Sequence, residues 1–289
     1  MKSGFINIFG RPNAGKSTLL NALMGEKLAI VSGKVQTTRH RIKGILTTDA
    51  FQLIFSDTPG IIDAPRYKLH EKMMLAVKEA LEDADLALLL VDVNENWEEA
   101  NQIFTDLHLK VPALVVINKI DTTNKEKINE AETFFRQQKY CHGVLAISAA
   151  TGLSQKKFIK VVLPFIPEGP PYFDGDDISD LQTRFFVGEL IREKIYELAQ
   201  EEIPYQATVM VQEYKEKESL VKIVADIIVH RETQKMILIG KQGSMIKKIG
   251  TAARKDIEAF IGQKVFLELF VKVKPKWRDN ELKLKEYGY

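Results

Sequence analysis

A glycine-rich segment near the start of the chain has the residue types of a phosphate-binding loop. The segment reads GRPNAGKST and spans residues 10–18. Gly10 and Gly15 allow the backbone to curl so that its N–H groups point toward phosphate oxygens. Lys16 could then reach the β- and γ-phosphates, and the Ser17 hydroxyl could bind Mg²⁺. A chance match in a glycine turn is the alternative, but the full pattern predicts a nucleotide site.

The residues on either side of this loop supply the elements that such a loop needs. An apolar run at 5–9 predicts a short buried strand before it, and apolar residues at 19–23 predict a helix after it. The positive end of that helix's dipole would favour phosphate. The candidate phosphate-binding residues are Gly10, Arg11, Pro12, Asn13, Ala14, Gly15, Lys16, Ser17 and Thr18.

A second motif, DTPG, directly follows the predicted strand at 51–57. Asp57 could hold Mg²⁺ through a water, and the Gly60 amide could contact a γ-phosphate and be released when that phosphate is lost. Asp-Thr-Pro-Gly alone is a common turn sequence, but its position after a phosphate loop predicts a switch. We include Thr58 and Pro59 among the nucleotide-binding candidates.

A polar segment between the two motifs, SGKVQTTRHR at 32–41, lacks periodicity and predicts a mobile loop. A threonine hydroxyl from this loop would complete the Mg²⁺ shell only when the γ-phosphate is present. We choose Thr38, with Thr37 second, and an ordinary exposed loop is the alternative. The candidate metal ligands are Ser17, Thr38 and Asp57. The candidate catalytic residues are Lys16, Ser17, Thr38 and Gly60.

The motif NKID, at 118–121, follows an apolar strand and indicates which base is bound. Asp121 could accept hydrogen bonds from N1–H and the 2-amino group of guanine, whereas adenine would leave this carboxylate unpaired. Asn118 would tie the base loop to the phosphate loop, and the stem of Lys119 would cover the base. Ser148 and Ala149 follow the last strand, and the Ala149 amide could donate to guanine O6. The cofactors expected are therefore GTP or GDP with Mg²⁺.

The residue after Gly60 affects the expected rate of hydrolysis. Ras-like enzymes carry a water-orienting glutamine there, and this chain has Ile61. We expect slow intrinsic GTP hydrolysis that a partner could raise.

Alternation of apolar and amphipathic segments predicts an α/β fold over the first half, with a mostly parallel sheet covered by helices on both faces. A hairpin between adjacent strands should place one edge strand antiparallel. The strands expected are 4–10, 42–49, 51–57, 85–92, 112–118 and 143–148. The helices expected are 16–25, 68–82, 98–109, 124–138 and 153–163.

Composition limits the other possibilities. The chain has 289 residues, enough for two domains, and its single cysteine excludes a disulfide framework or a cysteine-rich zinc site. The N-terminus enters the first strand directly, so we expect no signal peptide. Apolar runs are too short for a membrane span.

Four prolines, two glycines and several acids between Leu163 and Leu181 predict a domain junction. The order after it is helix, two strands, helix, Gly240-Lys241-Gln242-Gly243, helix and strand, which matches an α+β K homology domain. Residues 231–278 carry 12 basic and 4 acidic side chains, although the whole chain has a net charge of only +2. This asymmetry and the GxxG turn favour RNA over a solvated lysine-rich face. The RNA-binding candidates are Ile239, Gly240, Lys241, Gln242, Gly243, Ile246, Lys247, Lys248 and Arg254.

Taken together, these motifs make the chain closely resemble the bacterial Era family of GTPases. The residues that carry the resemblance are GRPNAGKST, QTTRHRI (36–42), DTPG, NKID, EGPPYF in the junction, ELIREKI (189–195), IPY (203–205), IGKQGSMIKKIGTAAR (239–254) and KWR (276–278). A departure is Ile61-Ile62-Asp63, where the family usually has a histidine soon after the glycine.

The resemblance implies a P-loop GTPase domain at 1–165, a linker at 166–182, a type II K homology domain at 183–275 and a tail at 276–289. It implies binding to the 3′ end of small-subunit ribosomal RNA and a role in maturation of the small ribosomal subunit. It also implies peripheral association at the inner membrane. We expect a cytoplasmic protein and, by default, a monomer. The alternatives are a membrane-associated signalling GTPase and a GTPase of an RNA-modification complex.

Overall fold

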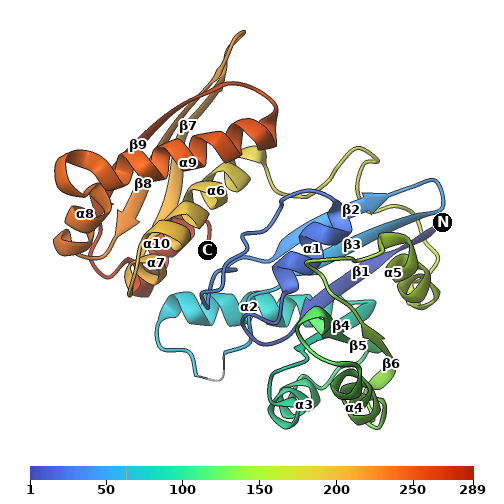
Figure 1. Cartoon of the computed structure of the whole chain (residues 1–289). Coiled ribbons are helices and arrows are strands. Elements are labelled where there is room, and N and C mark those ends of the chain that lie inside the picture. Colours follow the sequence, from blue (N-terminus) through green and yellow to red (C-terminus); the bar gives the residue numbers. More distant parts are fainter. Residues whose placement is uncertain (63) are drawn as a thin grey trace. The chain divides into compact units, whose positions relative to one another are not determined.

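The computed structural model describes residues 1–62 and 64–289, which form two compact units (Figure 1). The first unit comprises Met1–Ala64 and Met73–Asp180. The second comprises Pro65–Lys72 and Leu181–Tyr289. The proline-rich junction therefore lies where the first unit ends and the second begins.

One sheet forms the centre of the first unit, with strand order β2-β3-β1-β4-β5-β6. All neighbouring strands are parallel except β2 and β3, so the mostly parallel sheet and its antiparallel edge hairpin are confirmed. The short connection between β2 and β3 permits only this antiparallel pairing. The strands are β1 (Lys2–Phe9), β2 (Ile42–Thr47), β3 (Phe51–Asp57), β4 (Leu86–Asp92), β5 (Ala113–Asn118) and β6 (Cys141–Ala146).

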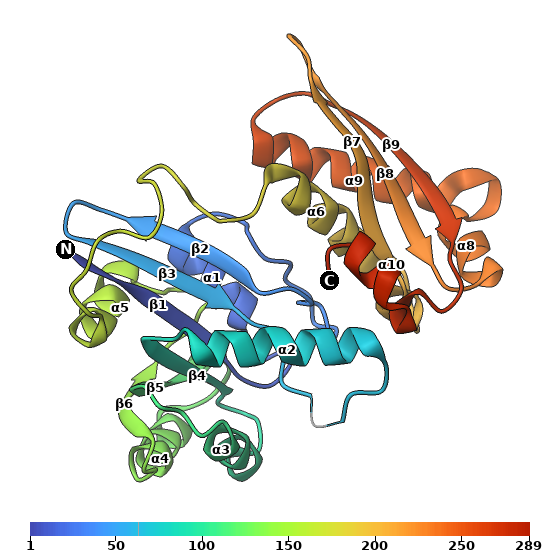
Figure 2. The ribbon, with the colours of Figure 1, turned by 180° about the vertical axis from the view of Figure 1, so that it is seen from behind.

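Helices cover both faces of this sheet, as Figures 1 and 2 show from opposite sides. Side chains of α2, α3 and α4 share a core with one face, and α1 and α5 lie on the other. Strands β4 and β5 are buried on both faces, which explains their continuous apolar sequences. The helices are α1 (Lys16–Met24), α2 (Lys68–Glu82), α3 (Trp97–Asp106), α4 (Lys125–Arg136) and α5 (Gln155–Val162), with 3₁₀ turns η1 (Ile120–Thr122) and η2 (Leu163–Phe165).

Boundaries differ from expectation where the backbone leaves regular geometry. Helix α3 ends at Asp106 and not at 109, because His108 has a φ of 49°, which a right-handed helix cannot contain. Strand β1 ends at Phe9, since Gly10 has a φ of 155°. Strand β6 occupies Cys141–Ala146, where we expected 143–148.

The junction does not simply leave the first unit; it runs along the sheet and is bound to it. Gln52, fully buried on β3, donates from Nε2 to the Phe173 carbonyl at 2.9 Å and accepts from the Tyr172 and Phe173 N–H groups at 2.7 and 3.0 Å. The Ile45 N–H donates to the Ile178 carbonyl at 3.0 Å. The junction therefore covers part of the edge strand β2, which would otherwise expose unpaired backbone groups.

The second unit has a three-stranded sheet in the order β7-β8-β9. The pair β7 and β8 is antiparallel, and β8 and β9 are parallel. Its strands are β7 (Thr208–Glu216), β8 (Val221–Val229) and β9 (Val265–Val273). Its helices are α6 (Thr183–Leu198), α7 (Ile203–Gln206), α8 (Glu232–Ile239), α9 (Ser244–Ile261) and α10 (Glu281–Glu286), with 3₁₀ turns η3 (Lys241–Gly243) and η4 (Trp277–Asp279).

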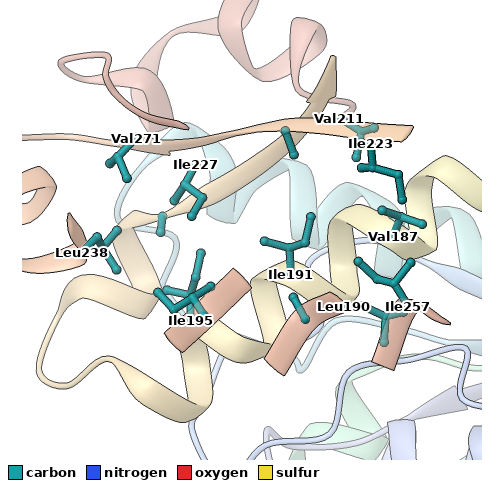
Figure 3. Close-up of a cluster of buried hydrophobic side chains, with 14 of the residues drawn as sticks. Val187, Leu190, Ile191, Ile195, Val211, Ile223, Ile227, Leu238, Ile257 and Val271 are labelled. Carbon is teal, nitrogen blue, oxygen red and sulfur yellow. The ribbon is translucent and has the colours of Figure 1, made fainter. Parts of the chain in front are cut away.

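Alternate residues of this sheet form a core with α6, α8 and α9 (Figure 3). The helical spacing of Val187, Ile191 and Ile195 turns one stripe of α6 toward the core that it shares with the sheet. Ile223 and Ile227, two of the β8 residues on the inner face, meet this stripe. The predicted order of helix, strand, strand, helix, turn, helix and strand is confirmed.

The C-terminal segment has structure that the sequence did not suggest to us. Trp277 is fully buried, and its Nε1 donates to the Gln206 carbonyl at 3.0 Å. Its ring lies 5.9 Å from that of Tyr287 and 6.1 Å from that of Tyr289, measured between centroids. The tail is thus a packed part of the second unit.

Replacing this tryptophan, as in Trp277→Ala, should lower the stability of the second unit by about 3–5 kcal/mol, because a large buried ring and its hydrogen bond are lost. Urea unfolding followed by circular dichroism would measure the change. Trp97→Ala, in the first unit, is the control and should leave the transition of the second unit in place. An unchanged transition in Trp277→Ala would contradict the packing described above.

Candidate functional site

The loop between β1 and α1 has the shape that its glycines allow. Gly10 and Gly15 have φ values of 155° and 101°, in the region that favours glycine. A Cβ at Gly15 would collide with the Asn118 side-chain amide, and one at Gly10 with the Leu90 carbonyl. Lys16 Nζ donates to the carbonyls of Gly10 and Arg11 at 3.0 and 2.9 Å, so the loop closes around the ammonium group.

Three of the predicted polar side chains meet beside this loop. Ser17 Oγ lies 2.6 Å from Asp57 Oδ2 and 2.9 Å from Thr38 Oγ1, and Thr38 Oγ1 lies 3.2 Å from the same carboxylate oxygen. Thr37 is placed differently, because its hydroxyl donates to the Lys34 carbonyl. The structure therefore brings together Ser17, Thr38 and Asp57 and leaves Thr37 outside this cluster.

The cluster fits a hydrated magnesium ion. Asp57 Oδ1 is buried and has no hydrogen-bond partner among the residues that the structure describes. Mg²⁺ is usually held by one or two protein oxygens together with waters and phosphate oxygens. Residues 1–62 and 64–289 contain no group of three or more His, Cys, Asp or Glu side chains that could hold a metal ion. Ser17, Thr38 and Asp57 would hold the ion when it is bound.

Burial disfavours both charges of the site. Desolvation lowers the pKa of Lys16 to about 8, although the Asp57 and Glu95 carboxylates favour its charge. Desolvation raises the pKa of Asp57 to about 6, opposed by Lys16 and by hydrogen bonds from Ser17 and Thr38. An anion beside Lys16 and a cation beside Asp57 would relieve both penalties.

The DTPG segment lies against the phosphate loop. Thr58 Oγ1 donates to the Ile8 carbonyl at 2.7 Å, which fixes the start of the segment on β1. A Cβ at Gly60 would lie 2.8 Å from Pro12 Cγ and 2.9 Å from Pro12 N, so only glycine fits this close approach. The sequence Ile61-Ile62-Asp63 is where this chain departs from the usual family pattern. Of these three residues, Asp63 lies outside the described residues.

Asn118 joins the base loop to the phosphate loop. Its Nδ2 donates to the Ala14 carbonyl at 2.9 Å, and its Oδ1 accepts from the Ala149 N–H at 3.0 Å. Asn118 thus fixes the loop after β5 and the loop after β6 at the same edge of the sheet. Asp121 is exposed, and Lys119 has a left-handed φ of 61°.

A cavity of about 380 Å³ opens where these loops meet. Its lining combines the phosphate loop, the predicted mobile loop, Gly60 and Lys119. Eight of the eighteen nucleotide-binding candidates line this cavity, which lies at the carboxyl ends of the parallel strands, where α/β sheets bind ligands. They are Pro12, Asn13, Gly15, Lys16, Ser17, Thr18, Gly60 and Lys119.

The second unit carries the other candidate site, at the turn between α8 and α9. Gly240 and Gly243 have φ values of 72° and 78°, and Gln242 between them has 52°. A Cβ at Gly240 would lie 2.8 Å from Met245 N, whereas one at Gly243 would meet nothing within 4 Å. The outer side of the turn is therefore open to a close approach by a ligand backbone.

Charged and apolar side chains surround this turn. Exposed basic and polar candidates are Lys241, Gln242, Lys247, Lys248 and Arg254. Ile239 and Ile246 are half-buried and pack on the core, so they contribute to the fold as well as to the surface. Met236 and Ile237 are 64% and 53% exposed, which is unusual for apolar residues on a short helix. We did not select Met236 from the sequence, because helical periodicity alone does not distinguish an exposed apolar residue from a core one.

Comparison with known proteins identifies the family. A family described as "50S ribosome-binding GTPase" matches residues 5–119, and a "KH domain" family matches residues 202–278. "GTPase Era" from Geobacter metallireducens is 44% identical over 292 residues, covering 100% of this chain and 98% of that protein. "GTPase Era" from Geotalea uraniireducens is 45% identical over 291 residues, covering 100% and 98%. The chain belongs to the Era family of GTPases.

Two solved Era structures match the complete chain. One is a single-residue variant of Aquifex aeolicus Era bound to GDP·AlF4⁻, with a TM-score of 0.95, 37% identity and coverage of 100% of this chain and 99% of that one. The other is Era in complex with MgGDPNP and nucleotides 1506–1542 of 16S ribosomal RNA, with a TM-score of 0.94, 38% identity and the same coverage. The α/β domain followed by a K homology domain is therefore confirmed. In addition, no helix among the described residues of this Era family member has both the length and the apolar character to cross a membrane.

Because Asn118 connects three loops, Asn118→Ala should destabilise the first unit by about 2–4 kcal/mol: two hydrogen bonds are lost and the buried Ala149 N–H is left without its acceptor. Chemical unfolding would measure this loss. The control is Asp121→Ala, three residues along the same loop and exposed, which should change stability by less than about 0.5 kcal/mol. Equal stability of the two variants would show that Asn118 does not hold the loops together.

Proposed function

We propose that this Era family member is a GTP-hydrolysing switch that binds the 3′ end of small-subunit ribosomal RNA and assists maturation of the small ribosomal subunit. The observation that supports the switch is the cluster of Ser17, Thr38 and Asp57 beside Lys16. One oxygen of the Asp57 carboxylate is held by two hydroxyls, and the other is buried and ready for a further partner.

Each part of the phosphate site has a distinct role in this proposal. Backbone N–H groups of the loop at 10–18 bind phosphate oxygens, and Lys16 contacts the β- and γ-phosphates. Bound Mg²⁺ would supply positive charge to the phosphates that react. Thr38 and Gly60 respond to the γ-phosphate, so its loss releases the segments that carry them.

Hydrolysis should be slow without a partner. Ile61 follows Gly60, and its apolar side chain cannot orient an attacking water. The catalytic residues that we propose, Lys16, Ser17, Thr38 and Gly60, act through charge and positioning. Single-turnover kinetics of the purified chain would measure the intrinsic rate.

Guanine is selected by Asp121, while Asn118, Lys119, Ser148 and Ala149 complete the base site. The Ala149 N–H, which we expected to donate to guanine O6, donates to Asn118 Oδ1 in this structure and so fixes the loop after β6. The carboxylate of Asp121 accepts from N1–H and from the 2-amino group, and no other common purine offers both donors. Its exposure in this structure leaves it accessible to a base.

The change Asp121→Asn should lower GTP affinity by about 100-fold or more and favour xanthosine triphosphate, because an amide can donate to the 2-oxo group of xanthine. Titration with fluorescent GTP and XTP analogues would measure both affinities. Unfolding of the variant provides the control for folding. Retained GTP affinity would contradict the assignment of the base site.

The K homology domain binds RNA at the turn Gly240–Gly243 in this proposal. An Era relative has been solved with nucleotides 1506–1542 of 16S ribosomal RNA, and this chain matches it along its whole length. The open outer side of the turn allows an RNA backbone to approach the N-terminus of α9. Lys241, Lys247, Lys248 and Arg254 add positive charge, and Ile239, Gln242 and Ile246 contact the bases or backbone.

Replacement of the turn glycine, Gly243→Asp, should reduce affinity for an oligonucleotide of the ribosomal RNA 3′ end by about 10-fold or more, because it adds strain and negative charge where phosphate approaches. Gly262→Asp is a matched control. Gly262 has a similar φ of 70°, also lacks neighbours within 4 Å, and lies at the opposite end of α9. Gel-shift or anisotropy titrations would measure the RNA affinity of both variants. An equal loss of affinity in the two variants would show that added charge or strain, and not the position of the turn, causes the effect.

A membrane-associated signalling GTPase is the alternative, with the basic surface at 231–278 bound to acidic lipid. In our main proposal, by contrast, the protein is a cytoplasmic monomer that also binds peripherally at the inner membrane. The Gly243→Asp variant also separates these two roles. It should weaken RNA binding but not binding to anionic vesicles, because vesicle binding depends on total charge and not on the turn. A role in an RNA-modification complex has weaker support, since the chain contains no second cofactor loop.

The domain limits in this proposal are 1–165, 166–182, 183–275 and 276–289. The GTPase domain, linker, K homology domain and tail follow in that order. Contacts of the linker with Gln52 and of the tail with Gln206 support treating each as attached to the domain beside it.

A further inference from the structure

The loop between β4 and α3 belongs to none of the nucleotide motifs described above, yet it contacts two of them. With the last residue of β4 included, it comprises residues 92–96, with the sequence DVNEN. Its backbone is attached to the base loop, since the Val93 N–H donates to the Asn118 carbonyl at 3.1 Å. We refer to residues 92–96 as the bridging loop.

We propose that the bridging loop positions the phosphate loop and the base loop relative to each other, with Asp92 holding Lys119 and Glu95 and Glu99 holding Arg11. This inference rests on the nucleotide site proposed above. It assigns a positioning role to carboxylates that belong to no recognised motif of the chain.

Asp92 holds the lysine of the base loop. Lys119 Nζ lies 2.7 Å from Asp92 Oδ2, while Asp92 Oδ1 accepts from the Asn94 N–H at 2.9 Å. Both oxygens of the carboxylate are therefore engaged. Because Lys119 lines the nucleotide cavity, fixing its ammonium group also fixes the alkyl stem that we expect to cover the base.

The arginine of the phosphate loop is held by Glu95 of the bridging loop and by Glu99 on α3. Arg11 Nη1 lies 2.6 Å from Glu99 Oε2, and Arg11 Nε lies 3.9 Å from Glu95 Oε2. The other oxygen of Glu95 accepts from the Asp92 N–H at 3.1 Å. Glu95 thus contacts Arg11 and the residue that holds Lys119, and the Arg11 carbonyl in turn accepts from Lys16.

Further hydrogen bonds attach the bridging loop to the residues that follow the base motif. Asn94 Nδ2 donates to Thr122 Oγ1 at 2.8 Å, and Thr122 Oγ1 donates to the Lys119 carbonyl at 2.7 Å. Asn96 caps α3 and also donates to Glu99 Oε1 at 3.2 Å. A continuous series of contacts therefore runs from Arg11 to Lys119.

Stability of the fold does not account for this arrangement. The side chains of Arg11 and Glu99 are 34% and 59% exposed, and exposed ion pairs contribute little. Burial raises the pKa of Glu95 to about 7, although the Asp92 N–H and Arg11 favour its charge, so its placement is costly. A cost of this kind beside a ligand cavity is typical of a functional site.

The test is the rate at which the full-length protein releases bound nucleotide, measured with fluorescent GDP and a nonhydrolysable GTP analogue. Asp92→Asn and Glu95→Gln should each raise the release rate of both nucleotides about fivefold or more. In Asp92→Asn, the rate of hydrolysis at saturating GTP should stay within about twofold, because this side chain does not contact the phosphates. Asp106→Asn, on the distal end of α3, is the control and should leave the release rates unchanged.

The double variant distinguishes coupling from two separate effects. Removal of both carboxylates should raise release about as much as the larger single change, because both act through one loop. Unchanged release in the single variants, or multiplied effects in the double variant, would overturn the inference. Urea midpoints equal to wild type establish that the variants are folded. If the wild-type protein bound no guanine nucleotide, the proposed function itself would be wrong, and the inference would fail with it.

Discussion

The buried carboxylate of Asp57 is the constraint on which the nucleotide site depends. It is fully buried at the end of a central strand, beside the ammonium of Lys16 and two hydroxyls. Such a charge is tolerated only where partners are fixed, so the phosphate loop and the loop carrying Thr38 must close on it. The same burial that disfavours the charge prepares the site for a metal-bound polyphosphate, whose binding replaces the missing counter-charges.

Fixed partners in turn require a rigid sheet edge. Strands β1, β5 and β6 present their carboxyl ends at the same edge of the sheet, and Asn118 links the loops that follow them. The second unit is built differently. Its helices α6, α8 and α9 share a core with one face of a small sheet, and the glycine turn lies between α8 and α9.

Much of both units could be predicted from the sequence, and the exceptions have a common cause. The order of elements and the main motif residues followed from local patterns, because strand and helix periods and glycine turns are properties of neighbouring residues. Gln52 and Trp277 were not recognised as structural anchors, since their partners lie 121 and 71 residues away along the chain. The bridging loop was missed for the same reason: Asp92 and Glu95 are ordinary surface-type residues until the fold places Lys119 and Arg11 next to them.

The sequence by itself determined the nature of the chain: a nucleotide loop, a residue suited to guanine, no glutamine after Gly60, and a basic glycine turn in a second domain. These are choices of residue type and short spacing, which need no knowledge of distant contacts. Only the tertiary structure decided that Thr38 and not Thr37 joins Ser17 and Asp57, that the junction binds the sheet, and that carboxylates outside the motifs hold two motif side chains. Each of these depends on the distance between side chains from separate strands and loops, which packing of the whole domain fixes.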